Sequence, residues 1–379
     1  MNTVRYGIVG IGKQGSIYAS FLRDKKVDGA QLTAVCDIDE KRIDWAKENL
    51  KDVKIFKDYK EMFNSGLVDA IVVNTPHYIH PEIVEEALKA GLNVLTDKPI
   101  GVYTKRVNEM LKVKDQHPNQ TFGIIWNQRT NPLYRRAKEI IESGEAGEIT
   151  RVNWIITNWY RTTAYYSQAG WRGSWNGEGG GVLLNQAPHQ LDLITWLCGL
   201  PKSVFAVCKT VGRNISVEND VTALLEFENG STGVFVTTTH DAPGTNRLEI
   251  TLEGGKIVIE AGVLTYTKNE MLEPLFNKTN TEFWGFPKNE VITYSEKLEP
   301  IDGYNGNLEH INIFRNYTDY LLGKTNKLIA NGAEGIKSLY LSNAIYLSSY
   351  LNKRIDIPFD EDLFIEFLDL KRENELKNK

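Results

Sequence analysis

The sequence predicts an α/β protein with a doubly wound parallel sheet first and an α+β domain with a mostly antiparallel open sheet second. Its 379 residues exceed the usual size of one compact domain. Up to about residue 125, short apolar runs alternate with amphipathic segments, which is typical of a parallel sheet covered by helices. Beyond it, strand-like segments follow one another without helices between them, which indicates antiparallel pairing. We therefore expect domains over residues 1–125 and 126–379, with the helix expected over residues 335–351 packing back on the first domain.

A glycine-rich turn follows the first expected strand, residues 4–9, and precedes an expected helix over residues 16–22. Residues 10–15 read GIGKQG, a GxGxxG pattern between strand and helix. In a dinucleotide-binding turn the first glycine permits the bend, the second lets the backbone approach a pyrophosphate, and the third lets the helix pack on the strand. The positive end of the helix then faces the phosphates. This predicts a Rossmann domain with these cofactor contacts: Gly10, Gly12, Lys13, Gln14 and Gly15.

The cofactor preference depends on Asp37. It ends the second expected strand, residues 32–36, and lies 22 residues beyond Gly15. An acid at this distance accepts hydrogen bonds from the adenosine ribose hydroxyls and repels a 2′-phosphate. We therefore expect NAD rather than NADP, although Lys41 and Arg42 nearby act against that preference.

Other polar residues follow further strands of the first domain. Expected strands over residues 69–74, 93–96 and 121–126 share an edge at their carboxyl ends, where open α/β sheets bind ligands. The residues expected beside the cofactor at these ends are Asn74, Thr75, Pro76, Asp97 and Lys98.

The second domain contains an unusual segment over residues 171–197. A glycine run over residues 177–181 is expected to be a flexible loop, and a helix is expected from about Pro188. On that helix His189 and Asp192 are i, i+3 neighbours, with Asn185 near its start. Aromatic residues interleaved with Arg161 suit either core packing or stacking on a sugar ring.

Composition excludes several classes of partner. The net charge is -5 without a dense basic run, which disfavours nucleic-acid binding and attachment to membranes. No signal peptide and no apolar run of about 18 residues is recognised. Three cysteines at unrelated spacings suggest small buried side chains in a reducing cytoplasm. His77 and His80 lack an evident third ligand, so no metal site is expected.

Several of these motifs occur together in one known family. The glycine turn, Thr75-Pro76 followed by His80, residues 97–99 (DKP), and the glycine run leading to His189-x-x-Asp192 are in the family's order. The sequence thus resembles the glucose-fructose oxidoreductase/inositol dehydrogenase (Gfo/Idh/MocA) family over nearly its whole length. That resemblance implies dehydrogenase or reductase activity on CH–OH groups of sugars and cyclitols. It also implies a homo-oligomer, dimer or tetramer, that forms through the open sheet.

The resemblance also implies roles for individual residues. Lys98 matches the family's catalytic lysine, with Asp97 where glutamate is usual, and His189 matches the histidine that contacts the reacting hydroxyl. One departure is Asn185, because many members have aspartate there and an amide accepts no proton. Beyond the catalytic pair, Trp171, Arg172 and His80 are expected at the cofactor, and Asn185, Asp192, Tyr165 and Arg161 at the substrate.

Oxidation of a secondary alcohol removes a hydride and a proton, and the protein must take the proton while NAD takes the hydride. A lysine serves if burial or a nearby positive charge lowers its pKa. Lys98 fits that role for a small sugar, glycoside or polyol substrate. Two alternatives stay open. One is a redox-neutral enzyme that retains NAD during elimination or epimerisation, and the other is a non-catalytic regulatory protein that binds the dinucleotide.

Overall fold

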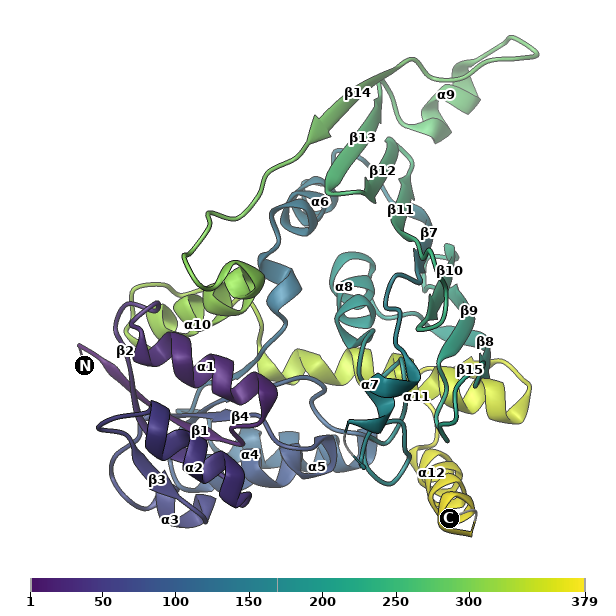
Figure 1. Ribbon diagram of the computed structural model, residues 1–379. Coiled ribbons are helices and arrows are strands. Elements are labelled where there is room, and N and C mark those ends of the chain that lie inside the picture. The colour runs from purple at the N-terminus through teal and green to yellow at the C-terminus, as the bar shows by residue number, and fades with distance from the viewer. Residues whose placement is uncertain (1, 169, 378–379) are drawn as a thin grey trace. The chain divides into compact units, whose positions relative to one another are not determined.

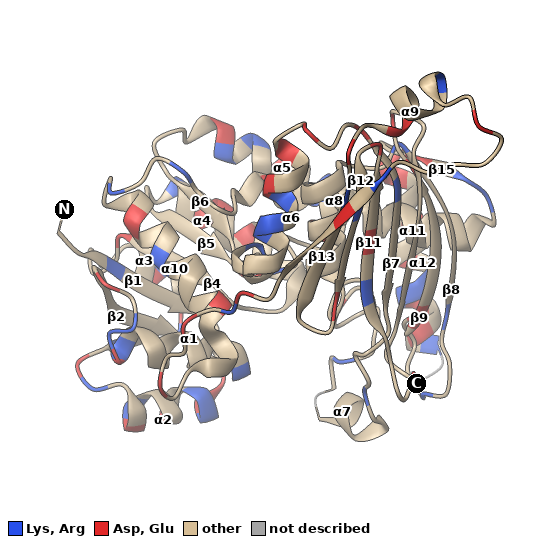
Figure 2. Ribbon diagram, turned by 90° about the horizontal axis from the view of Figure 1, so that it is seen from above, with Lys and Arg blue, Asp and Glu red and all other residues tan. Residues whose placement is uncertain are grey.

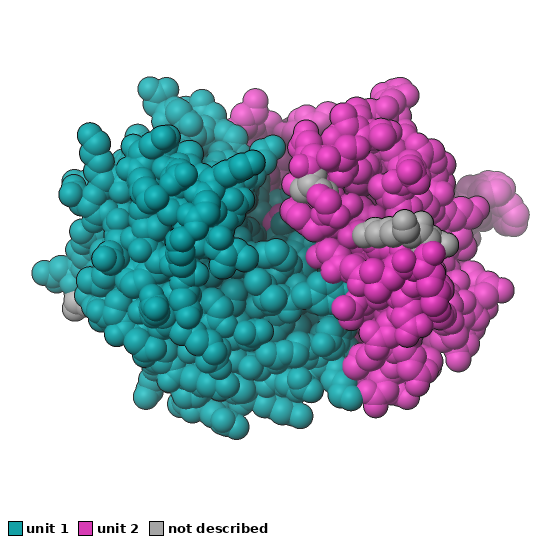
Figure 3. Space-filling model, turned by 60° about the horizontal axis from the view of Figure 1, so that its bottom comes forward, with its two compact units in different colours: residues 1–130, 299–339 teal, residues 131–298, 340–379 magenta. Residues whose placement is uncertain are grey.

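Contacts along the chain divide it into two units in the computed structural model, which describes residues 2–168 and 170–377. Unit 1 comprises Met1–Thr130 and Glu299–Leu339, and unit 2 comprises Asn131–Leu298 and Tyr340–Lys379 (Figure 3). This division differs from the expected one, because the sequence pattern placed the segment Glu299–Leu339 in the second domain.

Unit 1 is a parallel six-stranded sheet with the strand order β3-β2-β1-β4-β5-β6. This confirms the predicted doubly wound sheet. Its strands are β1 Val4–Val9, β2 Ala30–Cys36, β3 Lys54–Phe56, β4 Ala70–Val73, β5 Asn93–Thr96 and β6 Phe122–Ile124. Its helices include α1 Lys13–Arg23, α2 Glu40–Asn49, α3 Tyr59–Phe63, α4 His80–Lys89, α5 Thr104–Gln116 and α10 Leu308–Leu321.

Helix α10 belongs to unit 1 because its apolar face is buried beside α1 (Figure 1). The Phe314 ring lies 4.9 Å from that of Phe21 and 5.2 Å from that of Tyr18, centroid to centroid. The Tyr6 hydroxyl lies 2.8 Å from that of Thr318, so a buried hydrogen bond ties β1 to this helix. These contacts join residues about 300 positions apart, and no local pattern predicts them.

Unit 2 contains a nine-stranded sheet with the order β14-β13-β12-β11-β7-β10-β9-β8-β15. All neighbours pair antiparallel except β7 and β10, which confirms a mostly antiparallel sheet. The strands are β7 Ile149–Ile156, β8 Ser203–Lys209, β9 Asp220–Glu226, β10 Thr232–Thr238, β11 Asn246–Leu252, β12 Gly255–Glu260, β13 Val263–Asn269, β14 Asn289–Tyr294 and β15 Ile355–Asp356. Its helices include α6 Pro132–Glu142, α7 Thr163–Ser167, α8 Pro188–Cys198, α9 Glu273–Thr279 and α12 Glu361–Lys377, while α11 Gly335–Leu351 crosses the boundary between the units.

The two faces of this sheet differ. Burial alternates along β8, β9 and β10, so every second side chain points into the core of unit 2. Helices α6 and α8 lie on the covered side in both ribbon views (Figures 1 and 2). On the other side, Phe205 and Leu224 are register partners and both are exposed. Lys and Arg are mixed with Asp and Glu in both units (Figure 2). Among the described residues, no helix is both long and apolar enough to cross a bilayer.

Candidate active site

The glycine-rich turn in unit 1 has the geometry of a pyrophosphate-binding turn. Gly10 has a positive φ of 87°, and a Cβ there would lie 2.2 Å from the Asn74 carbonyl oxygen. A Cβ on Gly15 would lie 2.0 Å from the Gly10 carbonyl oxygen, so α1 packs closely on the turn. A Cβ on Gly12 would meet nothing within 4 Å. Gly12 is also the N-cap of α1, which no side chain caps. The turn therefore offers backbone N–H groups to an anion, and it fits a dinucleotide.

Asp37 follows β2 directly, and backbone donors fix its carboxylate. Oδ2 accepts from the Ile11 N–H at 2.8 Å, and Oδ1 accepts from the Asp39 N–H at 2.9 Å. The first bond ties this acid to the glycine-rich turn. A negative charge is therefore held beside the expected ribose position.

Asn74 connects the glycine-rich turn to Lys98. Its Oδ1 and its carbonyl both lie against the turn, because added Cβ atoms on Gly15 and Gly10 would meet them. Its Nδ2 donates to Asp97 Oδ2, and Asp97 Oδ1 accepts from the Lys98 N–H at 2.8 Å. The strand ends of β4 and β5 thus hold half-buried Lys98 in the same hydrogen-bonded cluster as the turn.

His80 joins the same two strand ends. Its ring nitrogens lie 2.6 Å from the Thr75 carbonyl oxygen and 2.8 Å from the Pro99 carbonyl oxygen. Burial lowers the pKa of His80, although the hydrogen bonds to these two carbonyl oxygens raise it. The side chain sits between the segment after β4 and the segment after Lys98, and it positions both. Lys13, also expected at the cofactor, is exposed at the start of α1 with Gln14 next to it.

Two residues that the sequence did not suggest lie in this cluster. The Tyr18 hydroxyl donates to Asp97 Oδ2 at 3.2 Å, and its ring centroid is 5.8 Å from that of His310 on α10. Burial lowers the pKa of His310 to about 4; the Asp97 carboxylate opposes this, and Lys98 adds to it. Tyr18 contacts Asp97 from α1 and His310 packs on Tyr18 from α10, so only the fold reveals them.

In unit 2 the glycine run is packed rather than flexible, which corrects the expectation of a loose loop. Glu178 and the glycines at 179–181 are buried. A Cβ on Gly181 would lie 1.8 Å from the Glu218 carbonyl oxygen, and one on Gly180 would lie 2.3 Å from the Tyr346 hydroxyl. Side chains are thus excluded here because the backbone passes close to two buried residues.

Glu218 anchors this run. Its carboxylate accepts from the N–H groups of Gly181 at 2.9 Å and Leu183 at 3.0 Å, and from the Tyr346 hydroxyl at 2.8 Å. Burial raises the pKa of Glu218 to about 7, although these three donors lower it. The anchor fixes the backbone that leads into α8.

Helix α8 begins at Pro188, as expected, and carries His189 in its first turn. His189 and Asn185 are half-buried, whereas Asp192 is 1% exposed. Asn185 Nδ2 donates to Glu178 Oε1. Burial of Asp192 favours an orienting role within unit 2 over contact with a substrate.

The expected arginine and aromatic residues of unit 2 form one cluster around Tyr165. The guanidinium of Arg161 lies 5.0 Å from the centroid of the Tyr165 ring, and that of Arg172 lies 4.6 Å from it. Arg172 also donates to the Tyr165 hydroxyl at 2.5 Å and lies 4.7 Å from the Trp171 ring. Gln186 donates to the same hydroxyl at 3.2 Å, which links the cluster to the residue after Asn185.

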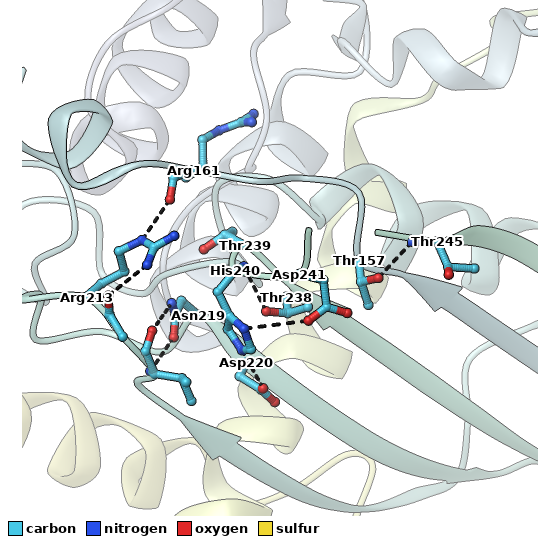
Figure 4. A network of polar contacts seen from close by, with 12 residues as sticks. Thr157, Arg161, Arg213, Asn219, Asp220, Thr238, Thr239, His240, Asp241 and Thr245 are labelled. Atoms are coloured by element: carbon cyan, nitrogen blue, oxygen red, sulfur yellow. Dashed lines mark hydrogen bonds and ion pairs between the residues drawn. The ribbon is translucent and has the colours of Figure 1, made fainter. Parts of the chain in front are cut away.

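A polar network at the end of β10 holds the Arg161 backbone (Figure 4). The Arg161 N–H donates to the Thr239 carbonyl at 2.8 Å, and its carbonyl accepts from Arg213 Nε at 2.8 Å. In the same network His240 Nε2 lies 2.8 Å from Asp220 Oδ2, across neighbouring strands. The Arg161 backbone is therefore fixed on both sides by residues from other segments of unit 2.

Fold and glycine-rich turn together define a protein with a Rossmann domain for a dinucleotide and a second, sheet-containing unit. The family model described as an oxidoreductase family with an NAD-binding Rossmann fold matches residues 4–123. The model of the GFO/IDH/MocA C-terminal domain matches residues 134–258. The chain belongs to the Gfo/Idh/MocA family of oxidoreductases.

Known proteins with similar sequences and structures include sugar and inositol dehydrogenases. Inositol 2-dehydrogenase of Corynebacterium glutamicum is 23% identical over 233 residues, which are 60% of this chain and 65% of that protein. The WlbA dehydrogenase of Bordetella pertussis, solved with NADH and UDP-GlcNAcA, is 27% identical, with a TM-score of 0.76 over 94% of this chain and 100% of that one. Scyllo-inositol dehydrogenase of Lactobacillus casei, solved with NAD(H) and scyllo-inositol, shares the fold at 21% identity and a TM-score of 0.72, over 94% and 100% of the chains.

Proposed function

We propose that this protein is an NAD-dependent dehydrogenase that moves a hydride between nicotinamide and a secondary alcohol of a sugar, glycoside or cyclitol. The observation that carries the proposal is the Asn74 link. One side chain contacts the dinucleotide turn and also holds Asp97, the residue before Lys98. The backbone of Lys98, a residue capable of proton transfer, is thereby held beside a turn that fits a dinucleotide.

Some of the unit 1 residues bind the cofactor, and another accepts the proton. The N–H groups at the start of α1 bind the pyrophosphate, and Asp37 binds the ribose. Bound NAD supplies the hydride acceptor. Lys98 accepts the hydroxyl proton at Nζ, and Asp97 and His80 keep its segment in place.

In unit 2, His189 holds the substrate hydroxyl from the first turn of α8. The Tyr165 ring and the Arg161 guanidinium offer an aromatic ring and a cation, which suit the face and the hydroxyl groups of a sugar. The relatives support this substrate class, since they include an inositol 2-dehydrogenase and a dehydrogenase solved with UDP-GlcNAcA.

A substrate screen tests the proposal. The purified protein is incubated with NAD and, separately, with inositols, free hexoses and glycosides, and free NADH is followed by its absorbance. Formation of NADH with one of these classes, and its loss in Lys98→Ala, is the expected result. Substrate consumption without free NADH would indicate the redox-neutral alternative, and no conversion of any class would contradict the proposal.

A further inference from the structure

A buried carboxylate, Glu178, lies inside the loop that leads to α8. It is 2% exposed. Its Oε2 accepts from the Gly173 N–H at 2.6 Å, and its Oε1 accepts from Asn185 Nδ2. The turn over residues 174–178 closes under Gly173 through the bond from the Glu178 N–H to the Ser174 carbonyl at 2.9 Å. A charge taken from water needs such partners, so these bonds stabilise a carboxylate in the interior of unit 2.

These two hydrogen bonds of Glu178 reach two parts of the candidate site. Gly173 follows Trp171 and Arg172, which are expected to contact the cofactor. Asn185 lies in the turn before α8, where its N–H donates to the Gly181 carbonyl at 3.0 Å. One carboxylate therefore sets the distance between the Trp171–Arg172 segment and the segment that carries His189.

The chemistry of this contact determines which residue position 185 accepts. An ionised carboxylate only accepts hydrogen bonds, so its neighbour must donate. An asparagine amide donates, whereas an aspartate would place a second carboxylate against Glu178. Two carboxylates at hydrogen-bond distance cannot both ionise, and one then keeps a proton. The amide at position 185 is thus the partner that the buried Glu178 requires.

We propose that Glu178 is a positioning residue of this active site, which acts by holding Asn185 and the Gly173 backbone in one hydrogen-bonded unit. The inference rests on the proposed dehydrogenase function. It assigns the departure of Asn185 from the usual aspartate to the presence of Glu178. Glu178 and Asn185 act as a matched pair, and either can change only if the other changes with it.

A cycle of four proteins tests the pair: wild type, Asn185→Asp, Glu178→Gln and the double variant. In Asn185→Asp the two carboxylates repel, so kcat is expected to fall roughly 10- to 100-fold at alkaline pH and to recover as pH falls and one proton is shared. In the double variant the introduced glutamine accepts from the Gly173 N–H through its carbonyl and donates to the introduced aspartate through its amide. Activity at alkaline pH is therefore expected to return to within about threefold of wild type.

Other titratable groups near Glu178 are the same in all four proteins. Tyr166 is electrostatically coupled to Glu178 and Glu218, and its hydroxyl is 2.8 Å from that of Thr239. Glu218 is held by Gly181, Leu183 and Tyr346. Their titration cancels when the pH profiles are compared within the cycle. Asn229→Asp is a matched control, because Asn229 Nδ2 also donates to a carboxylate, Glu148, at 3.5 Å, at an exposed position outside the site. It should leave kcat and KM unchanged.

Thermal unfolding of the same proteins separates this inference from the proposed function. Non-additive shifts in Tm together with recovery of kcat in the double variant support a positioning role. Non-additive Tm without recovery of kcat would overturn it, because the pair would then serve stability alone. An Asn185→Asp protein that is as active as wild type at alkaline pH would also overturn the positioning role. If no protein of the set oxidises any sugar, the proposed function fails. The Tm values still test the pair in that case, because additive shifts would show that Glu178 and Asn185 are not coupled.

Discussion

Asp37 is the residue on which cofactor choice depends. Its carboxylate is fixed by the N–H groups of Ile11 and Asp39, so it does not turn away from a ribose. A 2′-phosphate would meet this charge, and NAD is expected to bind about tenfold or more tightly than NADP, a difference of about 1.4 kcal/mol. Asp37→Ser should narrow the ratio of the two Kd values, measured by titration of the protein with NADH and NADPH. Equal binding of both by the unaltered protein would contradict this role.

Lys98 and His189 are expected to affect different kinetic constants. Lys98→Ala should reduce kcat by roughly 10²- to 10⁴-fold, because that is the contribution of a positioned acid–base group. The Kd for NAD should change little, since Asp37 and the glycine-rich turn hold the dinucleotide. His189→Ala should lower kcat and also raise KM for the sugar, because it removes a substrate contact.

A matched control for this comparison is Lys89→Ala. Lys89 is an exposed lysine on α4 that pairs with Glu86 at 3.2 Å. Its replacement should leave all the constants unchanged. Near-normal turnover in Lys98→Ala would show that another group takes the proton, and His189 would then be the next residue to test.

At the scale of secondary-structure elements, the glycine run before α8 should make the free energy of unfolding depend on pH, because Glu218 anchors it. Burial raises the pKa of this carboxyl from its ordinary value of 4.5 to about 7, so the folded state keeps a proton that the unfolded state has lost. This proton adds up to about 3 kcal/mol to the free energy of unfolding. The contribution is complete below about pH 4.5 and is lost as the pH rises through about 7.

Urea unfolding at several pH values measures this effect. The free energy of unfolding of the wild type should fall between about pH 5 and pH 8 by more than that of Glu218→Gln, which carries no titrating group there. Glu228→Gln, at an exposed position after β9, is the matched control and should follow the wild type. Parallel pH curves for wild type and Glu218→Gln would rule out this coupling.

Local patterns predicted the elements that carry their own signal. The GxGxxG turn, the strand that ends at Asp37 and the helix that begins at Pro188 could be recognised because spacing and residue type act within a few positions. Short β3, with three residues, and two-residue β15 are too brief for a periodic signal. Likewise, the packing of the glycine run depends on Glu218 and Tyr346, which are distant in the sequence.

Part of the site could not be predicted because it forms only on folding. Lys98, Asp97 and Asn74 were expected together, since parallel strands end at one edge of the sheet. Tyr18 reaches Asp97, and His310 packs on Tyr18, through helix packing, which no spacing rule describes. Similarly, the role of Glu178 depends on a contact with Asn185 seven positions away, within a turn of irregular backbone. A carboxylate three residues before the end of a glycine run is a weak signal by itself.

At the scale of the whole molecule, each unit contains a hydrogen-bonded cluster of its own. In unit 1 the glycine-rich turn, Asn74, Asp97 and Lys98 are connected by contacts within that unit. In unit 2 Glu178, Asn185 and the cluster around Tyr165 are likewise connected among themselves. Each cluster is therefore expected to keep its geometry if the units move as rigid bodies.

The uncovered face of the unit 2 sheet is expected to bind a second copy of this chain. Leu224 is 54% exposed opposite Phe205, and Val207 and Ile155 are exposed large apolar residues of the same sheet. The segment over residues 280–288 extends beyond the strands and adds exposed aromatics, with Phe283 at 89% and Trp284 at 81% (Figure 1). Exposed apolar area of this kind marks interaction surfaces, and an open sheet face is self-complementary in a symmetric dimer.

Leu224→Glu should weaken this association, because it would place a charge on the apolar face that the second copy is expected to cover. Sedimentation velocity over a range of protein concentrations should show the wild type as a dimer or tetramer and Leu224→Glu shifted toward monomer. Lys51→Glu, at an exposed position of unit 1, should behave as the wild type. The Tm of the Leu224→Glu monomer should stay close to that of the dissociated wild type, since Leu224 lies outside the core of unit 2. A wild type that sediments as a monomer at every concentration would show that this face does not bind a second copy.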